Sequence, residues 1–306
     1  MRELWLPRKL QSKSGMMSNS SLKFSRVAIA VHPQLPEALV EAEAIVKFLE
    51  EKEIQTIHGS LYDEALRDQV SFGEIDLLLA LGGDGTMLRA GHLCAPYKVP
   101  ILGINLGNFG FLTAIQQNEW RTALNQLLDG DSWIEQRMML TAEQIRGSEI
   151  IGSWDVLNEV AVSRAAIVRP VHLDTHVDGR FLTTYVADGL IAATPTGSTA
   201  YALAAGGPIL PPVLRNILLV PVAPHLSIDR AIVLSEGSEV TITVHTDHQA
   251  VICVDGQTPI PMQNKDQVHI RASEHTVKFV RIQDPGYFYR NLTPHMYHNP
   301  STGNSK

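Results

Sequence analysis

The chain has 306 residues, of which 44% are apolar and 19% are charged, and this composition is typical of a globular protein. The length predicts two domains. A formal net charge of -7 excludes a globally basic surface for nucleic acid or anionic lipid, although a local basic patch stays open. Chemistry on small molecules is the better hypothesis.

The cysteines and the N-terminus indicate a cytoplasmic protein. Two cysteines, Cys94 and Cys253, lie far apart without CxxC spacing, which supports neither a disulfide framework nor a cysteine metal site. We find no apolar run near the ~18 to 20 residues that cross a bilayer, and no signal-peptide core. Residues 1–25 are basic and serine-rich, so we expect a disordered extension with Met16 or Met17 as an alternative start, or else a short transit peptide.

Strands and helices are expected to alternate in the first 130 residues. Residues 26–31 (RVAIAV) read as a strand, and the following segment repeats apolar residues at helical spacing up to Leu49. Residues 75–81 (IDLLLAL) form a nearly continuous apolar run, typical of a strand covered on both faces. A helix at 86–94 and a buried strand at 100–105 follow. The order predicts a parallel-sheet α/β domain.

Short strands dominate the chain after Asp129-Gly130-Asp131, so we expect a domain boundary near residue 130. Asp178-Gly179 lies between two strand patterns and predicts a tight hairpin turn. Further strands are expected at 216–222, 239–244, 250–254 and 277–282. The resulting units are an extension (1–25), an α/β domain (26–130), a β-rich domain (131–283) and a tail (284–306). We expect the first part of the tail, with Tyr287, Phe288 and Tyr289, to fold back on the first domain.

The loop Gly82-Gly83-Asp84-Gly85-Thr86 lies at the carboxyl end of a predicted strand and opens a helix, where open α/β sheets bind ligands. Glycines let backbone N–H groups approach an anion, and the helix N-terminus favours phosphate. The carboxylate of Asp84 would repel phosphate unless it faces a metal or a hydroxyl, whose proton it can accept during phosphoryl transfer. The alternative is that Asp84 only caps the helix. GxxxxGK[ST] and GxGxxG are absent from the sequence.

A second candidate segment runs from Asp188 to Pro208 (DGLIAATPTGSTAYALAAGGP) and reads as a strand, a small-residue turn and an alanine-rich helix. Its hydroxyls gather at the expected helix start, where they could bind a ribose or phosphate: Thr194, Thr196, Ser198 and Thr199. Tyr201 could lie against a base. The alternative is a helix cap with ordinary core packing.

The motifs LGGDGTMLRA, GINLGNFGFLT, LNEVAV and DGLIAATPTGSTAYALAAGGPIL, in this order, resemble the bacterial NAD kinases over about residues 26–290. The GGDGT loop is shared with diacylglycerol and sphingosine kinases, whereas TPTGSTAY together with Asn158-Glu159 is more specific. The resemblance implies an α/β domain followed by a β-sandwich domain that binds NAD, with the site between them. It also implies a homodimer or homotetramer.

The resemblance further implies that the γ-phosphate of ATP, or in some members polyphosphate, is transferred to the 2′-hydroxyl of the adenosine ribose of NAD. A divalent cation is required, and we expect Mg²⁺ held by phosphate oxygens and one or two carboxylates. Matched positions supply the catalytic base, Asp84, and the pyrophosphate contacts, Gly85 and Arg89. Asn158 and Glu159 match the ribose and metal-phosphate region.

The remaining matches concern the dinucleotide. Asp188 matches a carboxylate that binds an amide or amino group, and Ala223 and Gln257 match peripheral contacts. The adenine and ribose loop corresponds to Thr199, Ala200, Tyr201, Ala202, Leu203 and Ala204. Each match has a simpler interpretation: Arg89 as an exposed helix charge, Asn158-Glu159 as a strand-end turn, and Gln257 as part of the Asp255-Gly256 hairpin.

Several features do not enter the predicted site. Gly103, Gly107 and Gly110 are expected to shape the backbone near Asn108 and Phe109, in a variable stretch. The near-pairs His172/His176 and His245/His248 have strand spacings that do not place both rings on one metal.

Two rival functions remain. A lipid kinase with a GGDGT loop would need an apolar pocket or membrane-facing surface, and no basic amphipathic helix is evident. A non-catalytic dinucleotide sensor would be expected to lack Asp84 or Glu159.

Overall fold

The computed structural model describes residues 24–32, 36–107, 110–113, 115–225 and 227–297. Of the predicted extension 1–25, residues 1–23 lie outside this part of the chain, whereas Phe24 packs in the α/β core and Ser25 binds Asp76. Asn108, Phe109 and the tail from residue 298 also lie outside it. Within it, no helix has the length and apolar character needed to cross a membrane.

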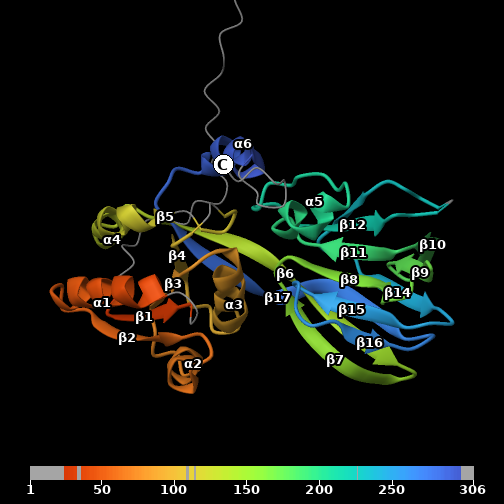
Figure 1. Ribbon diagram of the computed structural model, residues 1–306, viewed down its shortest axis with the longest axis horizontal. Coiled ribbons are helices and arrows are strands. Elements are labelled where there is room, and N and C mark those ends of the chain that lie inside the picture. Colours follow the sequence, from red (N-terminus) through yellow and green to blue (C-terminus); the bar gives the residue numbers. More distant parts are fainter. Residues whose placement is uncertain (1–23, 33–35, 108–109, 114, 226, 298–306) are drawn as a thin grey trace, which may run out of the picture.

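The α/β domain is built on four parallel strands in the order β4-β3-β1-β2 (Figure 1). They are β1 (Arg26–Val31), β2 (Gln55–Ser60), β3 (Leu77–Leu81) and β4 (Ile101–Asn105), and short β5 (Ile115–Gln116) pairs with β4. The helices are α1 (Pro36–Glu50), α2 (Glu64–Ser71), α3 (Asp84–Cys94) and α4 (Trp120–Leu128), the last preceded by a 3-10 turn at Gln117–Glu119.

Both faces of this sheet are covered by helices. Ile29 and Leu79 pack in one apolar cluster with α1 and α4, whereas Ala28 and Ala80 pack in another with α2 and α3. Every residue of β3 and β4 is buried for this reason. The prediction of doubly covered strands at 75–81 and 100–105 is confirmed.

The β-rich domain consists of two sheets packed face to face. One is six-stranded, in the order β13-β12-β11-β8-β15-β16; the other contains β6, β7, β9, β10, β14 and β17. Their bounds are β6 (Trp133–Arg146), β7 (Glu149–Val156), β8 (Glu159–Arg164), β9 (Val171–Val177), β10 (Arg180–Ala187), β11 (Gly189–Ala193), β12 (Asn216–Val222), β13 (Ile232–Ser235), β14 (Val240–His245), β15 (Ala250–Val254), β16 (Ile260–Met262) and β17 (Gln267–Arg281). One apolar cluster, with Leu140, Val160 and Ile242 among its members, fills the space between the sheets.

The predicted hairpin between β9 and β10 is confirmed, since Asp178 and Gly179 have φ of 51° and 73°. The strands expected at 216–222 and 250–254 are β12 and β15. The strand expected at 277–282 differs from its prediction. It is the end of β17, which continues past an irregularity between Ala272 and Thr276.

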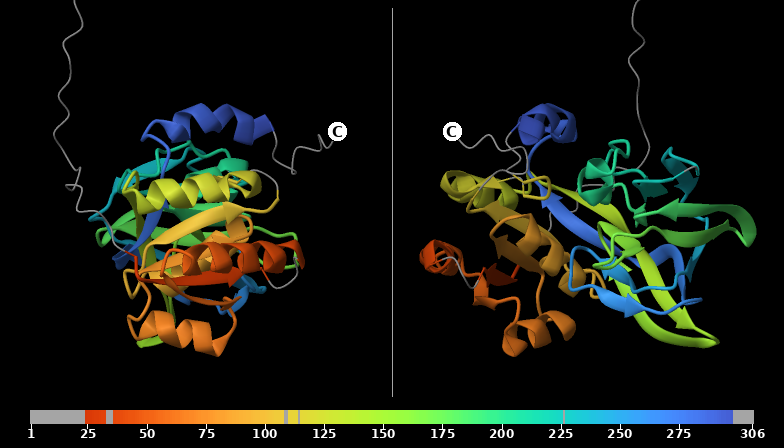
Figure 2. Two further views of the ribbon diagram at one scale, coloured as in Figure 1. Left: turned by 90° about the vertical axis from the view of Figure 1, so that its left-hand side faces the viewer. Right: turned by 45° about the vertical axis from the view of Figure 1, so that its right-hand side comes forward.

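Strand β17 belongs to both domains. Strand β6 runs along one of its edges, and the other edge pairs with β14 at its start and, at Phe279, with Ile101 of β4. One eleven-stranded sheet therefore extends through the whole molecule, and β6 and β17 cross from one domain into the other (Figures 1 and 2). The C-terminal helix α6 (Tyr287–Tyr297) lies over this crossing in the same views.

Candidate active site

The glycine loop has the place that the sequence predicts, between the end of β3 and the start of α3. Gly82 has a φ of 154°, and a Cβ there would lie 2.3 Å from the Thr86 hydroxyl oxygen. Gly83 is the N-cap residue, and the helix begins at Asp84. Unpaired N–H groups at such a terminus are suited to an anion.

Asp84 is half-buried and reaches across to the loop after β4. Its carboxylate accepts hydrogen bonds from the backbone N–H groups of Phe111, at 2.8 Å, and Leu112, at 3.0 Å. Gly83 is the N-cap residue of α3, and Asp84 is its first helical residue with its carboxylate bonded to another loop, so Asp84 does not only cap the helix. Gly110 leaves the space for this contact, because a Cβ there would lie 2.1 Å from an Asp84 oxygen.

Asn158 lies in the turn between β7 and β8, and Glu159 is the first residue of β8; Asp255 holds both. The Asp255 carboxylate accepts hydrogen bonds from the N–H groups of Leu157, Asn158 and Glu159 at 2.8, 2.7 and 3.0 Å. It also lies 2.7 Å from Nε2 of His92, on the same helix as Asp84. The sequence pattern marked Asp255 only as a hairpin residue, and its φ of 48° fits that turn. Its role in holding the Asn158 turn and His92 depends on the tertiary fold, and no sequence pattern indicated it.

The Glu159 side chain is buried, with 7% of its surface exposed, and its Oε2 has no hydrogen-bond partner among the residues described. Burial, together with the negative charge of Asp255, raises the pKa of Glu159 to about 8, although the Tyr201 N–H opposes the shift. At pH 7 most Glu159 side chains therefore carry a proton, which can be donated to a hydroxyl or lost when a cation arrives.

Three hydroxyls of the TPTGST turn donate hydrogen bonds to backbone carbonyl oxygens in or beside the turn. Thr194 donates to the Leu157 carbonyl at 2.5 Å, Ser198 to Pro195 at 2.6 Å, and Thr199 to Thr196 at 3.2 Å. The interpretation of Thr194 and Ser198 as ligand donors is corrected accordingly, because both side chains are fully buried and bonded to backbone. Arg137 Nη1 lies 3.5 Å from Thr196 Oγ1, in the same turn.

The expected alanine-rich helix is much shorter than predicted. A 3-10 turn at Gly197–Thr199 is followed by α5 (Tyr201–Ala204), a single turn. Gly197 packs on the Asn158 turn so closely that a Cβ would lie 2.1 Å from the Asn158 carbonyl oxygen. That contact fixes the chain before α5, and Gly206, with a φ of 86°, turns the chain away just after it, so the helical propensity of the alanines extends over one turn only.

The predicted adenine and ribose loop presents few side chains to a ligand. Thr199, Ala200 and Leu203 are half-buried, and Ala202 packs with Ile191 and Leu218 in an apolar cluster. Ala204 is exposed, and Tyr201 exposes 46% of its surface, so its ring is free to lie against a base.

Asp188 lies at the other end of β11 from Thr194, about 20 Å along the strand, and Ala223 follows the neighbouring strand β12 at that same end. Both carboxylate oxygens of Asp188 bind Arg164, at 2.7 and 3.1 Å, and the Asp188 N–H donates to Val222. Ala223 follows directly with a φ of 46°. The structure thus groups these two predicted residues together, away from the glycine loop.

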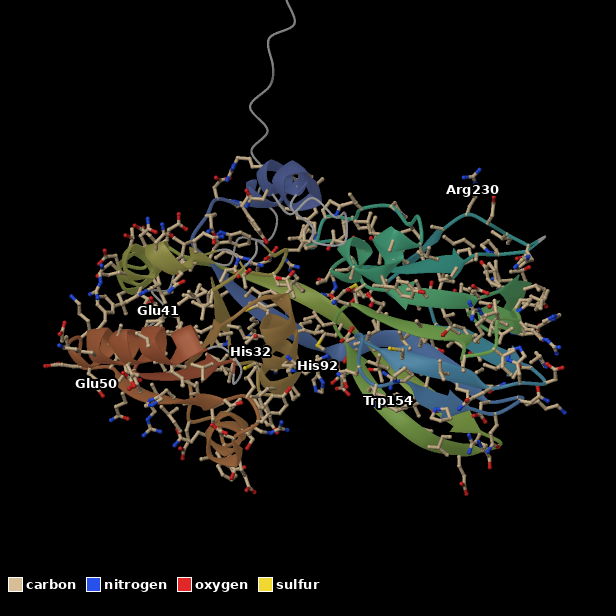
Figure 3. All side chains as sticks on the ribbon, in the orientation of Figure 1. His32, Glu41, Glu50, His92, Trp154 and Arg230 are labelled. Atoms are coloured by element: carbon tan, nitrogen blue, oxygen red, sulfur yellow. The ribbon has the colours of Figure 1, made fainter. Side chains whose placement is uncertain are left out.

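A cavity of about 800 Å³ separates α2 and α3 from the turn after β15. Its wall brings together three predicted residues, Gly85, Arg89 and Gln257, and adds Arg67 and His92. Figure 3 shows His92 at the junction of the two domains. The Arg89 guanidinium lies 5.8 Å from the centre of the Tyr62 ring, and its side chain is exposed.

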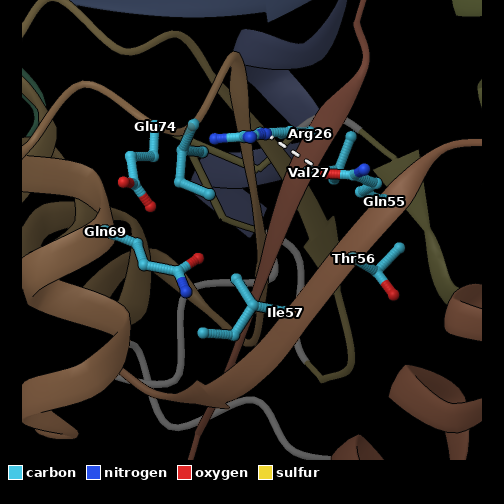
Figure 4. A pocket seen from close by; sticks show the side chains of 8 residues that line it. Arg26, Val27, Gln55, Thr56, Ile57, Gln69 and Glu74 are labelled. Atoms are coloured by element: carbon cyan, nitrogen blue, oxygen red, sulfur yellow. Dashed lines mark hydrogen bonds between the residues drawn. The ribbon is translucent and has the colours of Figure 1, made fainter.

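A second cavity, of about 390 Å³, lies at the amino ends of β1 and β2 and contains no predicted site residue (Figure 4). Arg26 donates to Gln55 there at 3.2 Å. Ligands of open α/β sheets bind at the carboxyl ends of the strands, which favours the larger cavity.

The paired histidines have other contacts. His172 lies opposite His245 on neighbouring strands, and His245 is 2.9 Å from Asp174. Within the described part of the chain, no group of three or more His, Cys, Asp or Glu side chains could hold a metal ion.

Comparison with known proteins identifies the family. Residues 62–132 match the ATP-NAD kinase N-terminal domain, and residues 157–282 match the ATP-NAD kinase C-terminal domain. The NAD kinase of Chloroflexus aurantiacus is 38% identical over 268 residues, covering 87% of this chain and 96% of the relative. That of Geotalea daltonii is 37% identical over 271 residues, covering 86% and 95%.

Solved structures agree with this result. The yeast NADH kinase complexed with NADH superposes with a TM-score of 0.75 at 25% identity, covering 95% of this chain and 98% of the other. An NAD kinase from Archaeoglobus fulgidus in complex with ATP has the same fold, with a TM-score of 0.71 at 24% identity and coverages of 89% and 99%. The chain belongs to the NAD kinase family. The expected fold class and the resemblance stated from its motifs are confirmed.

Gly110→Ala tests the packing around Asp84. Its added methyl group must displace the Asp84 carboxylate or the Phe111 backbone, so turnover should fall about 100-fold, the effect of a displacement near 1 Å. Steady-state kinetics and a thermal melt measure the change. Gly107→Ala is the matched control, since nothing lies within 4 Å of its Cβ position. Equal activities of the two variants would contradict the assignment.

Glu159→Gln tests the raised pKa of Glu159. Because the folded protein holds this proton up to a pH of about 8, and the unfolded chain loses it near the ordinary value of 4.5, the ligand-free protein should lose stability as pH rises between these values. The slope is at most about 1.4 kcal/mol per pH unit. Thermal melts from pH 5 to 9 should show it in the natural chain and in exposed Glu149→Gln, and a shallower slope in Glu159→Gln. Parallel curves for all three would exclude the shift.

Proposed function

We propose that this enzyme transfers the γ-phosphate of ATP to the 2′-hydroxyl of the adenosine ribose of NAD, giving NADP, with Asp84 as general base. The observation that carries the proposal is the Asp84 carboxylate, held at the glycine loop by the Phe111 and Leu112 N–H groups. The yeast relative with bound NADH and the archaeal relative with bound ATP support the choice of substrates.

The Asp84 carboxylate can accept a proton without leaving its place. Each of its oxygens takes one backbone hydrogen bond, which leaves further lone pairs toward a bound hydroxyl. As the 2′-oxygen attacks phosphorus, its proton passes to Asp84, and the bond from phosphorus to the leaving oxygen of the donor breaks. Backbone N–H groups of Gly83 to Gly85 stabilise the charge on the transferred group.

Asn158 and Glu159 would hold the ribose and the phosphates. Protonated Glu159 can donate to a ribose oxygen, and Asp255 orients the turn through three backbone bonds. The unpartnered Oε2 of Glu159 is also an oxygen ligand of the kind that Mg²⁺ prefers, so these residues fit a divalent cation. Mg²⁺ bound there would neutralise charge on the donor phosphates.

The remaining predicted contacts serve the dinucleotide in this proposal. Tyr201, whose backbone N–H bonds Glu159 and whose ring is exposed, supplies a surface for the adenine, with Thr199, Ala200, Ala202, Leu203 and Ala204 as the surrounding loop. Asp188, at the start of β11, would bind an amide or amino group of the dinucleotide, and Ala223 beside it and Gln257 on the cavity wall would contact its periphery. We also propose a homodimer or homotetramer, and polyphosphate as an alternative donor to ATP.

Asp84→Asn tests the general base. The amide keeps the size of the side chain but cannot take the proton, so turnover should fall about 10² to 10⁴-fold while NAD still binds. NADP formation with ATP and Mg²⁺, beside NAD titration by calorimetry, measures both quantities. Near-normal turnover in a folded Asp84→Asn protein would rule out the base.

Arg89→Ala tests the cavity as the site of the dinucleotide pyrophosphate. Loss of one charge-assisted hydrogen bond, worth about 1.5 to 3 kcal/mol, should raise the KM for NAD at least about 10-fold. The kcat should change little. Arg230→Ala is the control, because this arginine is exposed at the far edge of the β-rich domain (Figure 3). A KM for NAD equal to that of the control would place the pyrophosphate elsewhere.

A further inference from the structure

The C-terminal helix begins with a buried tyrosine. Tyr287, the first residue of α6, exposes 6% of its surface, whereas Tyr289 on the same helix exposes 64%. The Tyr287 hydroxyl lies 2.8 and 3.0 Å from the two carboxylate oxygens of Glu135 and accepts a hydrogen bond from Arg137 at 3.0 Å. Glu135 and Arg137 both belong to β6.

These side chains form a buried charge cluster with Arg281 of β17. Glu135 accepts hydrogen bonds from Arg281 Nε at 2.6 Å and from Arg137 Nη2 at 3.1 Å, and all three side chains are at most 3% exposed. The Arg281 guanidinium also lies about 5 Å from the centres of the Tyr287 and Phe279 rings. Buried charges are costly unless they are paired, so each member depends on the others for its position.

Arg281 connects this cluster to the catalytic loop. Its Nη1 donates to the Leu112 carbonyl oxygen at 2.9 Å, and the N–H of the same residue donates to Asp84 at 3.0 Å. Leu112 is therefore held at both backbone groups, by Asp84 on one side and by Arg281 on the other. The path from α6 to Asp84 consists of three contacts: Tyr287 to Glu135, Glu135 to Arg281, and Arg281 to Leu112.

We propose that α6 is a positioning element of the active site. By orienting Glu135 and Arg281, the Tyr287 hydroxyl fixes the Leu112 backbone, and the Leu112 and Phe111 N–H groups then aim the Asp84 carboxylate. Tyr287 is a positioning residue that touches neither substrate. The inference rests on the proposed role of Asp84 as the base.

The test compares Tyr287→Phe with Tyr289→Phe. The first change removes one buried hydroxyl and keeps the ring beside Arg281; the second removes an exposed hydroxyl from the same helix. For Tyr287→Phe we expect kcat to fall about 10-fold, with the KM values for NAD and ATP within twofold of the natural enzyme. Hydrogen exchange at the Phe111 and Leu112 amides should accelerate. Tyr289→Phe should match the natural enzyme, and an unchanged kcat and exchange rate in Tyr287→Phe would overturn the proposal.

A double-mutant cycle separates positioning from a general loss of stability. If Tyr287 acts through Asp84, Asp84→Asn and the double variant Asp84→Asn/Tyr287→Phe should have the same kcat. Losses that multiply would show that Tyr287 acts by another route. Should Asp84→Asn alone stay active, the proposed base fails, and amide exchange in Tyr287→Phe still decides whether α6 orders the loop.

Discussion

The shared strand β17 is the constraint on which the rest of the molecule depends. Its edge opposite β6 pairs first with β14 and then with β4, so the two domains are parts of one hydrogen-bonded sheet. Rotating one domain against the other would break backbone hydrogen bonds in the middle of this sheet, where they cannot be replaced by water. The helix that carries Asp84 therefore has a fixed relation to the turn that carries Glu159.

Buried polar groups also connect the two domains at this junction. Asp255 of the β-rich domain binds His92 of α3 and three N–H groups of the Asn158 turn, so one carboxylate connects both halves of the site. Among the residues described, Glu159 beside it has no hydrogen-bond partner for one carboxylate oxygen, and it keeps its proton at neutral pH. An unsatisfied buried group of this kind is costly to the empty protein and favourable once a ligand satisfies it.

Local sequence patterns were sufficient to predict the strands that are covered on both faces and the hairpin that is closed by a specific turn. The apolar runs of β3 and β4 and the Asp178-Gly179 hairpin depend on nearest-neighbour chemistry, and their predictions are confirmed. The alanine-rich stretch was misleading: the close approach of Gly197 to Asn158 fixes a 3-10 turn before the helix, and Gly206, with a φ of 86°, follows just after its end. The role of Asp255 could not be predicted, since its partners are about 100 and 160 residues away in the chain.

The amino-acid sequence by itself determined the order of the elements, the glycine loop at the end of a buried strand and the family, since all three are properties of contiguous residues. Only the tertiary structure decided what those residues contact. It showed Asp84 bonded to the loop after β4 in place of its own helix, the TPTGST hydroxyls bonded to backbone, and Tyr287 joined to Arg281 and Leu112. The physical reason is that hydrogen bonds and buried charges act over a few ångströms in space, while the groups that they join are separated in the chain by distances that no local pattern records.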